Sequence, residues 1–229
     1  MRPPKPFPLY PTYPELKELK LEHYPDLKAF LETGQSWRQQ HWQWGSNFLL
    51  YIGRNKSEHT YARFRNETER FLLWLFLFKD QPMGGLRKAD ILEYADFCWK
   101  PPVTWIGFTT ADHFSYENGF YTANPLWLPF RLKLPKNRPT DKEPDRKQYR
   151  PSQETLGAMF TAVIAFYKYL INEEICYGNP AQVAKTDCRH FIDDVQVKEV
   201  RRLTEEQWQY VLESAEAMAD RDGTFERAL

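Results

Sequence analysis

One long amphipathic segment constrains this chain more than any other feature. From residue 61 onward, mostly apolar side chains recur every three or four residues, which places them on one face of an α-helix. They are Tyr61, Phe64, Thr68, Phe71, Leu72, Leu75 and Phe78. Ser57 stands where an N-cap is expected, because its hydroxyl can accept a hydrogen bond from the first turn. The segment predicts a helix from Ser57 to Phe78 with one buried face.

Four further segments with the same period predict helices. They are residues 37–52, a segment that begins near residues 88–90 and is ended by Pro101 and Pro102, residues 152–171, and a segment from Thr204 onward. With 42% hydrophobic and 16% aromatic residues, the chain can build a packed core, which excludes general disorder. Three cysteines are too few for a disulfide framework. The longest apolar run, from Phe71 to Phe78, is too short to span a bilayer. We therefore expect a mainly α, soluble protein without a membrane partner.

Two stretches lack a helical period. The first 14 residues hold six prolines and predict an extended arm without regular structure. Residues 101–150 are rich in proline and aromatic side chains, and we expect them to form an irregular insertion. Within it, Asn118 and Gly119 can supply the positive φ angles of a tight turn, so one small hairpin is possible.

The charge of the chain is unevenly distributed. The 31 basic and 31 acidic residues give no net charge, which taken alone argues against a nucleic-acid partner. However, residues 203–229 hold seven acidic and two basic residues, so the preceding part carries a net charge of +5 (29 minus 24). Residues 131–150 alone contain eight basic residues against three acidic ones. Any surface for a polyanion should lie before residue 203.

A polar row runs along the face of the 57–78 helix opposite its apolar residues. His59, Arg63, Asn66 and Arg70 follow at i, i+4, i+7 and i+11, with Lys56 just before them. One interpretation is a solvated helix face, supported by the nearby Glu58, Glu67 and Glu69. The other is a face that crosses a DNA groove, where arginines bind phosphate and Asn66 or His59 reaches base edges. On either interpretation we expect Arg63 and Arg70 to lie off the core.

Other candidate groups also have two interpretations. The basic residues of the 131–150 stretch, including Lys147 and Arg150, form either a solvated linker or an arm that neutralises phosphates. Lys198, Arg201 and Arg202 form either a plain tether or a linker that follows the DNA backbone. Cys176, Cys188 and His190 lack the paired spacing of a zinc site, and no phosphate-binding glycine loop is present, so we expect no metal and no cofactor.

Three segments in order resemble the N-terminal half of the tyrosine recombinase, or phage-type integrase, family. The first runs from Ser57-Glu-His-Thr60-Tyr61 through Trp74-Leu75 to Leu86-Arg-Lys-Ala-Asp90-Ile91 and Tyr94. The second runs from Thr155-Leu156 through Tyr167-Lys168-Tyr169-Leu170 to Asn179-Pro180-Ala181. The third is Arg202-Leu203-Thr204 with Glu206 and Trp208, which is similar to the entry of the family's catalytic domain. Together they cover about half of the chain.

The resemblance implies a helical, SAM-like core-binding domain that clamps duplex DNA together with a catalytic domain. It also implies a homotetramer on DNA in the full-length protein, which exchanges strands through a phosphotyrosine intermediate. Two departures stand out: Gly157, Ala158 and Met159 replace polar residues expected after Leu156, and no "glycine, leucine, arginine" helix follows Thr204. We therefore expect a fragment that binds DNA but does not cut it, and the parent's enzymatic role stays open.

The sequence thus predicts an N-terminal extension (1–36), a core-binding domain (37–182) with the insertion at 101–150, a linker (183–202) and the first helix of a catalytic domain (203–229). The expected DNA-binding residues are Lys56, His59, Arg63, Asn66, Arg70, Lys147, Arg150, Gln153, Thr161, Lys168, Arg201 and Arg202. The partner is double-stranded DNA at a recombination half-site, with no small-molecule substrate, in a cytoplasmic, nucleoid-associated protein. The alternative is a non-enzymatic helical protein-interaction module that uses the aromatic 101–130 segment.

Overall fold

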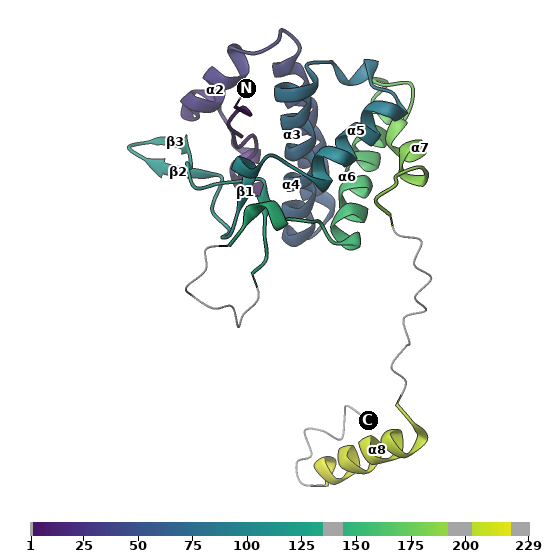
Figure 1. The fold of residues 1–229 in the computed structure, drawn as a ribbon. Coiled ribbons are helices and arrows are strands. Elements are labelled where there is room, and N and C mark those ends of the chain that lie inside the picture. Colours follow the sequence, from purple (N-terminus) through teal and green to yellow (C-terminus); the bar gives the residue numbers. More distant parts are fainter. Residues whose placement is uncertain (1, 135–143, 192–202, 221–229) are drawn as a thin grey trace. The chain divides into compact units, whose positions relative to one another are not determined.

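A computed structural model describes residues 2–134, 144–191 and 203–220 of the chain. It separates into two compact units, Met1–Ile192 and Asp193–Leu229. The first unit is mainly helical, as the sequence predicts, and has two small two-stranded pairings where one hairpin was expected (Figure 1).

Seven α-helices are described in the first unit. They are α1 (Tyr13–Lys17), α2 (Pro25–Glu32), α3 (Arg38–Asn55), α4 (Glu58–Trp74), α5 (Lys88–Trp99), α6 (Gln153–Asn172) and α7 (Pro180–Thr186). Four short strands accompany them: β1 (Ile106–Gly107), β2 (Phe114–Glu117), β3 (Phe120–Ala123) and β4 (Phe130–Arg131). Helix α7 spans residue 182, where the core-binding domain was expected to end and the linker to begin. It was not predicted, because a seven-residue helix carries too little periodicity to be recognised.

Side-chain caps start two of the long helices, α4 and α6, where the sequence predicts. Ser57 Oγ accepts a hydrogen bond from Thr60 N at the start of α4, and Ser152 Oγ accepts one from Thr155 N at the start of α6. α4 ends four residues earlier than predicted, at Trp74, where the backbone widens into a π turn (Leu75–Lys79). That turn ends at Asp80 with a positive φ of 49°.

The core lies between α3, α4, α5 and α6 and is built largely from aromatic rings. Phe48 of α3 stacks on Phe166 of α6, with ring centroids 5.1 Å apart. Phe71 of α4 meets Tyr94 of α5 and Tyr167 of α6 edge to face. Such contacts add about 0.5–1.5 kcal/mol per pair beyond the burial of apolar area.

α6 is the one helix in the described residues that is long and apolar enough to cross a membrane. Its apolar side chains, including Leu156, Phe160, Phe166 and Leu170, are buried inside the unit. Burial of this kind is typical of the core helix of a soluble protein, since a lipid-facing helix would leave those side chains exposed. The structure thus agrees with a soluble protein.

The N-terminal segment is part of the core, which differs from the extension expected over residues 1–36. Leu9 and Tyr10 are fully buried. The Trp42 indole N–H donates to the Leu9 carbonyl, and the Trp105 indole N–H donates to the Pro4 carbonyl. Prolines leave the chain extended as predicted, but extended backbone can still pair with side chains of the core.

The described parts of the 101–150 stretch, residues 101–134 and 144–150, contain more regular structure than an irregular insertion. β2 and β3 form the hairpin anticipated at Asn118 and Gly119, whose φ angles are both positive. β1 pairs with β4 in parallel. Four aromatic residues of this stretch, Trp105, Trp127, Phe130 and Tyr149, are buried. These described residues thus cover part of the helical core, with the hairpin projecting from them (Figure 1).

The second unit contains α8 (Glu205–Ala219). Thr204 caps it as predicted, in a capping box with Gln207. None of its described residues is buried, and Trp208 and Tyr210 are largely exposed.

Candidate nucleic-acid interface

The polar row of α4 divides into an exposed half and a covered half. Lys56, His59 and Arg63 are exposed, with no hydrogen bond or ion pair to any described residue. One turn further on, Asn66 is partly buried, and the side chain of Arg70 is only 15% exposed. The row therefore faces solvent only at its N-terminal end.

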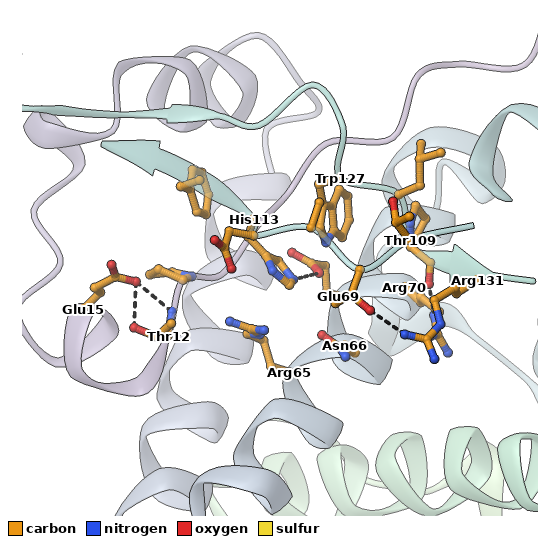
Figure 2. A pocket seen from close by; sticks show the side chains of 17 residues that line it. Thr12, Glu15, Arg65, Asn66, Glu69, Arg70, Thr109, His113, Trp127 and Arg131 are labelled. Carbon is orange, nitrogen blue, oxygen red and sulfur yellow. Dashed lines mark hydrogen bonds and ion pairs between the residues drawn. The ribbon is translucent and has the colours of Figure 1, made fainter. Parts of the chain in front are cut away.

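A cleft of about 560 Å³ opens along the covered half (Figure 2). It lies between α4, the N-terminal segment and two parts of the 101–150 stretch. Its lining residues are Pro11, Thr12, Glu15, Arg65, Asn66, Glu69, Arg70, Thr109, Thr110, Ala111, Asp112, His113, Phe114, Trp127, Leu128, Pro129 and Arg131. Figure 2 shows Arg65, Asn66 and Arg70 projecting from α4 on one side, and His113 and Trp127 on the other.

Glu69 fastens two distant segments to α4. One carboxylate oxygen accepts hydrogen bonds from the backbone N–H groups of Leu9 and Tyr10, at 2.5 and 3.2 Å. The other oxygen lies 2.9 Å from Nε2 of His113. Because Glu69 is only 1% exposed, these three donors are what make its burial tolerable. The Glu69–His113 pair thus joins the N-terminal segment and the loop before β2 to the helix.

Arg70 fastens a third segment. Its Nε donates to the Pro129 carbonyl at 2.7 Å, its Nη1 pairs with Glu67 at 2.7 Å, and its guanidinium lies over the Phe130 ring. Burial disfavours the charge, but the Glu67 carboxylate more than offsets that, so the pKa of Arg70 is raised above its ordinary value. Arg70 therefore packs against the protein itself, contrary to the expectation that it lies off the core.

Two arginines of the cleft are absent from the residues predicted from the sequence. Arg65 is partly buried, and its Nε is a buried donor without a partner in the described residues. Arg131 donates through Nη1 to the Thr110 hydroxyl, and no other hydrogen bond of its guanidinium is described. The one sequence feature that could have drawn attention to Arg65 is its position four residues before Glu69 on the same helix face. Arg131 belongs to the basic 131–150 stretch, but the sequence does not show the tertiary contact that places it at the cleft.

The cleft also contains acidic groups. Glu69 accepts hydrogen bonds from Leu9, Tyr10 and His113. Glu15 accepts hydrogen bonds from the backbone N–H and the hydroxyl of Thr12. Asp112 is exposed, with no partner among the described residues. The side chains of the cleft can thus bind a ligand through guanidinium and amide donors, next to one unoccupied carboxylate.

The remaining predicted residues lie on other elements. Lys147 and Arg150 are exposed in the turn before α6, where the Arg150 guanidinium donates to the Lys147 and Tyr149 carbonyls. On α6, Lys168 is exposed, and the Thr161 hydroxyl donates to Gly157 O within the helix. Gln153 is partly buried and donates to His190 O. None of these five lines the cleft, and Arg201 and Arg202 lie outside the described residues.

The cysteines and histidines near the end of the first unit have other partners. His190 lies 2.6 Å from an Asp96 oxygen and stacks on Trp99. Cys176 and Cys188 are buried, and burial raises the pKa of both thiols. In the part of the chain that the structure describes, no group of three or more His, Cys, Asp or Glu residues could hold a metal ion.

The polar face of α4 thus joins an exposed cationic end to a cleft with free guanidinium donors. Among the described residues, no hydroxyl or thiol is hydrogen-bonded to the His113 imidazole. We therefore interpret the Glu69–His113 pair as a contact that holds segments together. Comparison with protein families, with curated sequences and with solved structures returns no match to this chain.

Proposed function

We propose that the first unit binds duplex DNA as the N-terminal part of a site-specific tyrosine recombinase or integrase. It holds one half-site of a recombination site for cleavage and exchange by a catalytic domain. The observation that carries the proposal is the polar face of α4, where Lys56, His59 and Arg63 have no partner within the described protein. Cations without internal partners are available to neutralise phosphates.

The segments that resemble this family form helices, as the resemblance implies. The segments that resemble it lie on α4, α5 and α6, and Asn179 caps α7 through a hydrogen bond from Gln182 N to its side-chain oxygen. Thr204 begins α8 at the entry to the expected catalytic domain. These agreements of order and position support the proposal, which includes a DNA-bound cytoplasmic protein acting as a tetramer in its full-length form.

The structure narrows the expected interface. Arg70 is engaged by Glu67 and Pro129, so we assign it to the fold. We retain His59, Arg63 and Asn66 on α4, and Lys56 just before it. Lys147, Arg150, Thr161 and Lys168 stay candidate contacts, because each is exposed. A guanidinium binds phosphate oxygens or guanine in a bidentate manner, which gives Arg63 the largest expected share among the exposed residues of α4.

The test is fluorescence anisotropy of the full chain with a labelled duplex at several salt concentrations. We expect binding that weakens steeply with salt, and a salt slope that falls by about 0.9 for each phosphate contact removed. The variant Lys56→Ala/Arg63→Ala should bind more weakly with a shallower slope. Lys185→Ala, an exposed lysine on α7, is the matched control and should bind like the wild type. Absence of binding at low salt would contradict the proposal.

The second candidate function is that of a protein-interaction module. Exposed apolar and aromatic side chains in and near the hairpin favour it. Tyr116 is 64% exposed, Phe120 47% and Leu126 74%. Exposed aromatic residues are enriched at protein interfaces. If the chain fails to bind DNA but self-associates, and Tyr116→Ser/Phe120→Ser abolishes that association, this function replaces the first.

A further inference from the structure

The cleft beside α4 presents hydrogen-bond donors that the protein leaves unused. Arg65 carries a buried Nε without a partner in the described residues, although a buried donor normally finds one. Arg70 uses Nε and Nη1, and no bond of its Nη2 is described. Asn66 lies on the same wall, and no hydrogen bond of its amide is described. A ligand with several acceptor oxygens would satisfy these groups.

Two of the three arginines of the cleft, Arg70 and Arg131, are held in position before any ligand arrives. Pro129 O and Glu67 fix the Arg70 guanidinium at 2.7 Å each. The Thr110 hydroxyl fixes Arg131 on the opposite wall. Because guanidinium groups that are already oriented lose little freedom on binding, such a site favours a compact, multiply charged oxygen ligand.

The carboxylates of the cleft differ in how strongly they oppose the binding of an anion. Glu69 accepts three hydrogen bonds and Glu15 accepts two, so their charges are stabilised by N–H and O–H donors of the protein. Asp112 alone has no described partner and is exposed, where water screens its charge. Asp112 therefore weakens anion binding without preventing it, and removing its charge should have a measurable effect.

We propose that the cleft between α4 and the 109–131 segment is a phosphate-binding site, with Arg65 and Arg131 as its main donors and Asn66 as an additional one. The proposal rests on the proposed function in one respect: within the DNA complex, the occupant is a phosphodiester of the DNA backbone. The same chemistry would accept a free phosphate ion. The 101–150 stretch thereby converts one side of an ordinary helix face into a recessed anion site.

The first experiment uses inorganic phosphate and the isotope-labelled full chain. The Arg65 Nε–H resonance should shift on phosphate titration, with saturation. Arg65→Gln should weaken phosphate binding about tenfold, as expected for the loss of one charge-assisted hydrogen-bond donor. Asp112→Asn, on an exposed side chain, should instead strengthen it. No shift in the wild type, or no gain of affinity in Asp112→Asn, overturns the proposal without reference to DNA.

The second experiment repeats the duplex titration with the same variants. If the DNA phosphodiester occupies the cleft, Arg65→Gln weakens DNA binding and lowers the salt slope by about 0.9, and Asp112→Asn tightens it. If phosphate binds but both variants bind DNA normally, the phosphodiester assignment is wrong and the occupant is the free ion. If phosphate binds and the wild type does not bind DNA, the proposed function fails while the phosphate site stands. Lys185→Gln is the control in both experiments.

Discussion

The two halves of α4 carry the same kinds of side chain and use them in opposite ways. In the first half, His59 and Arg63 are exposed. In the second half, Glu67, Glu69 and Arg70 are largely enclosed. Glu69 binds the N-terminal segment and the loop before β2, and Arg70 binds the segment before β4 and pairs with Glu67. The difference shows that a polar row on a helix has no fixed meaning, because segments far away in sequence decide which part of it meets water.

The contrast has an energetic basis. An exposed charge is solvated by water and contributes little to stability, whereas a buried charge destabilises the fold unless every donor and acceptor is paired. Substitutions in the covered half should therefore act mainly on folding, and substitutions in the exposed half mainly on binding.

Glu69→Ala should have the largest effect of the substitutions. It leaves the N–H groups of Leu9 and Tyr10 and the His113 imidazole without their acceptor, so we expect a loss of about 3–5 kcal/mol in the free energy of unfolding. Denaturant unfolding measures this loss. Glu58→Ala, in the exposed first turn of the same helix, is the control and should change stability by less than about 1 kcal/mol. Similar small losses in both variants would erase the contrast.

Acid should produce the next largest effect through a buried histidine of α3. His41 donates from Nδ1 to Trp37 O and accepts at Nε2 from Met83 N, and burial lowers its pKa from 6.5 to about 4, with the Trp37 bond acting in the opposite direction. The His41 imidazole is therefore protonated at a lower pH in the folded state than in the unfolded state. The free energy of unfolding should have its full value above pH 6.5 and fall by about 3 kcal/mol as the pH drops toward 4.

This acid effect is isolated by comparing two variants. His41→Gln should remove this part of the pH dependence of unfolding, while His59→Gln, on the exposed half of α4, should retain it. Unfolding curves at a series of pH values give the comparison. An unchanged pH dependence in His41→Gln would show that other groups are responsible.

Arg70→Ala should have a smaller effect than Glu69→Ala. It removes the ion pair with Glu67 and the bond to Pro129, and it leaves a carboxylate that is 5% exposed without its counter-ion. We expect a loss of about 2 kcal/mol in the free energy of unfolding. Thermal or denaturant unfolding measures it. A variant as stable as the wild type would return Arg70 to the set of candidate DNA contacts.

Arg63→Ala should have the smallest effect on stability, within about 0.5 kcal/mol, because the side chain has no described partner. Its effect should appear in DNA binding, as a salt slope lowered by about 0.9. Unfolding and anisotropy on the same preparation separate the two quantities. A destabilised variant with normal DNA binding would reverse the assignment of the exposed half.

Much of the helical framework could be predicted from the sequence because its signals are local. Ser57, Ser152 and Thr204 each cap the helix that begins after them, and the hairpin forms at Asn118 and Gly119. Cap and turn residues act on groups two to four positions away, so one sequence is enough to identify them.

The cleft could not be predicted, because its contacts are long-range. Glu69 bonds to residues 59 and 60 positions earlier in the chain and to His113, 44 positions later. Arg70 and Arg131 likewise owe their positions to tertiary contacts. Helical periodicity places Arg63 and Arg70 on one face, but it contains no information about which of them another segment covers.

The bond between the Trp105 indole and the Pro4 carbonyl also bears on the order of events during synthesis. Its two partners are 101 residues apart, and Pro4 leaves the ribosome first. At about 5–20 residues per second, the leading segment waits roughly ten seconds for its last partner to be made. The segment around Pro4 is thus held by Trp105 only late in synthesis, and it is open to a nascent-chain chaperone during that interval.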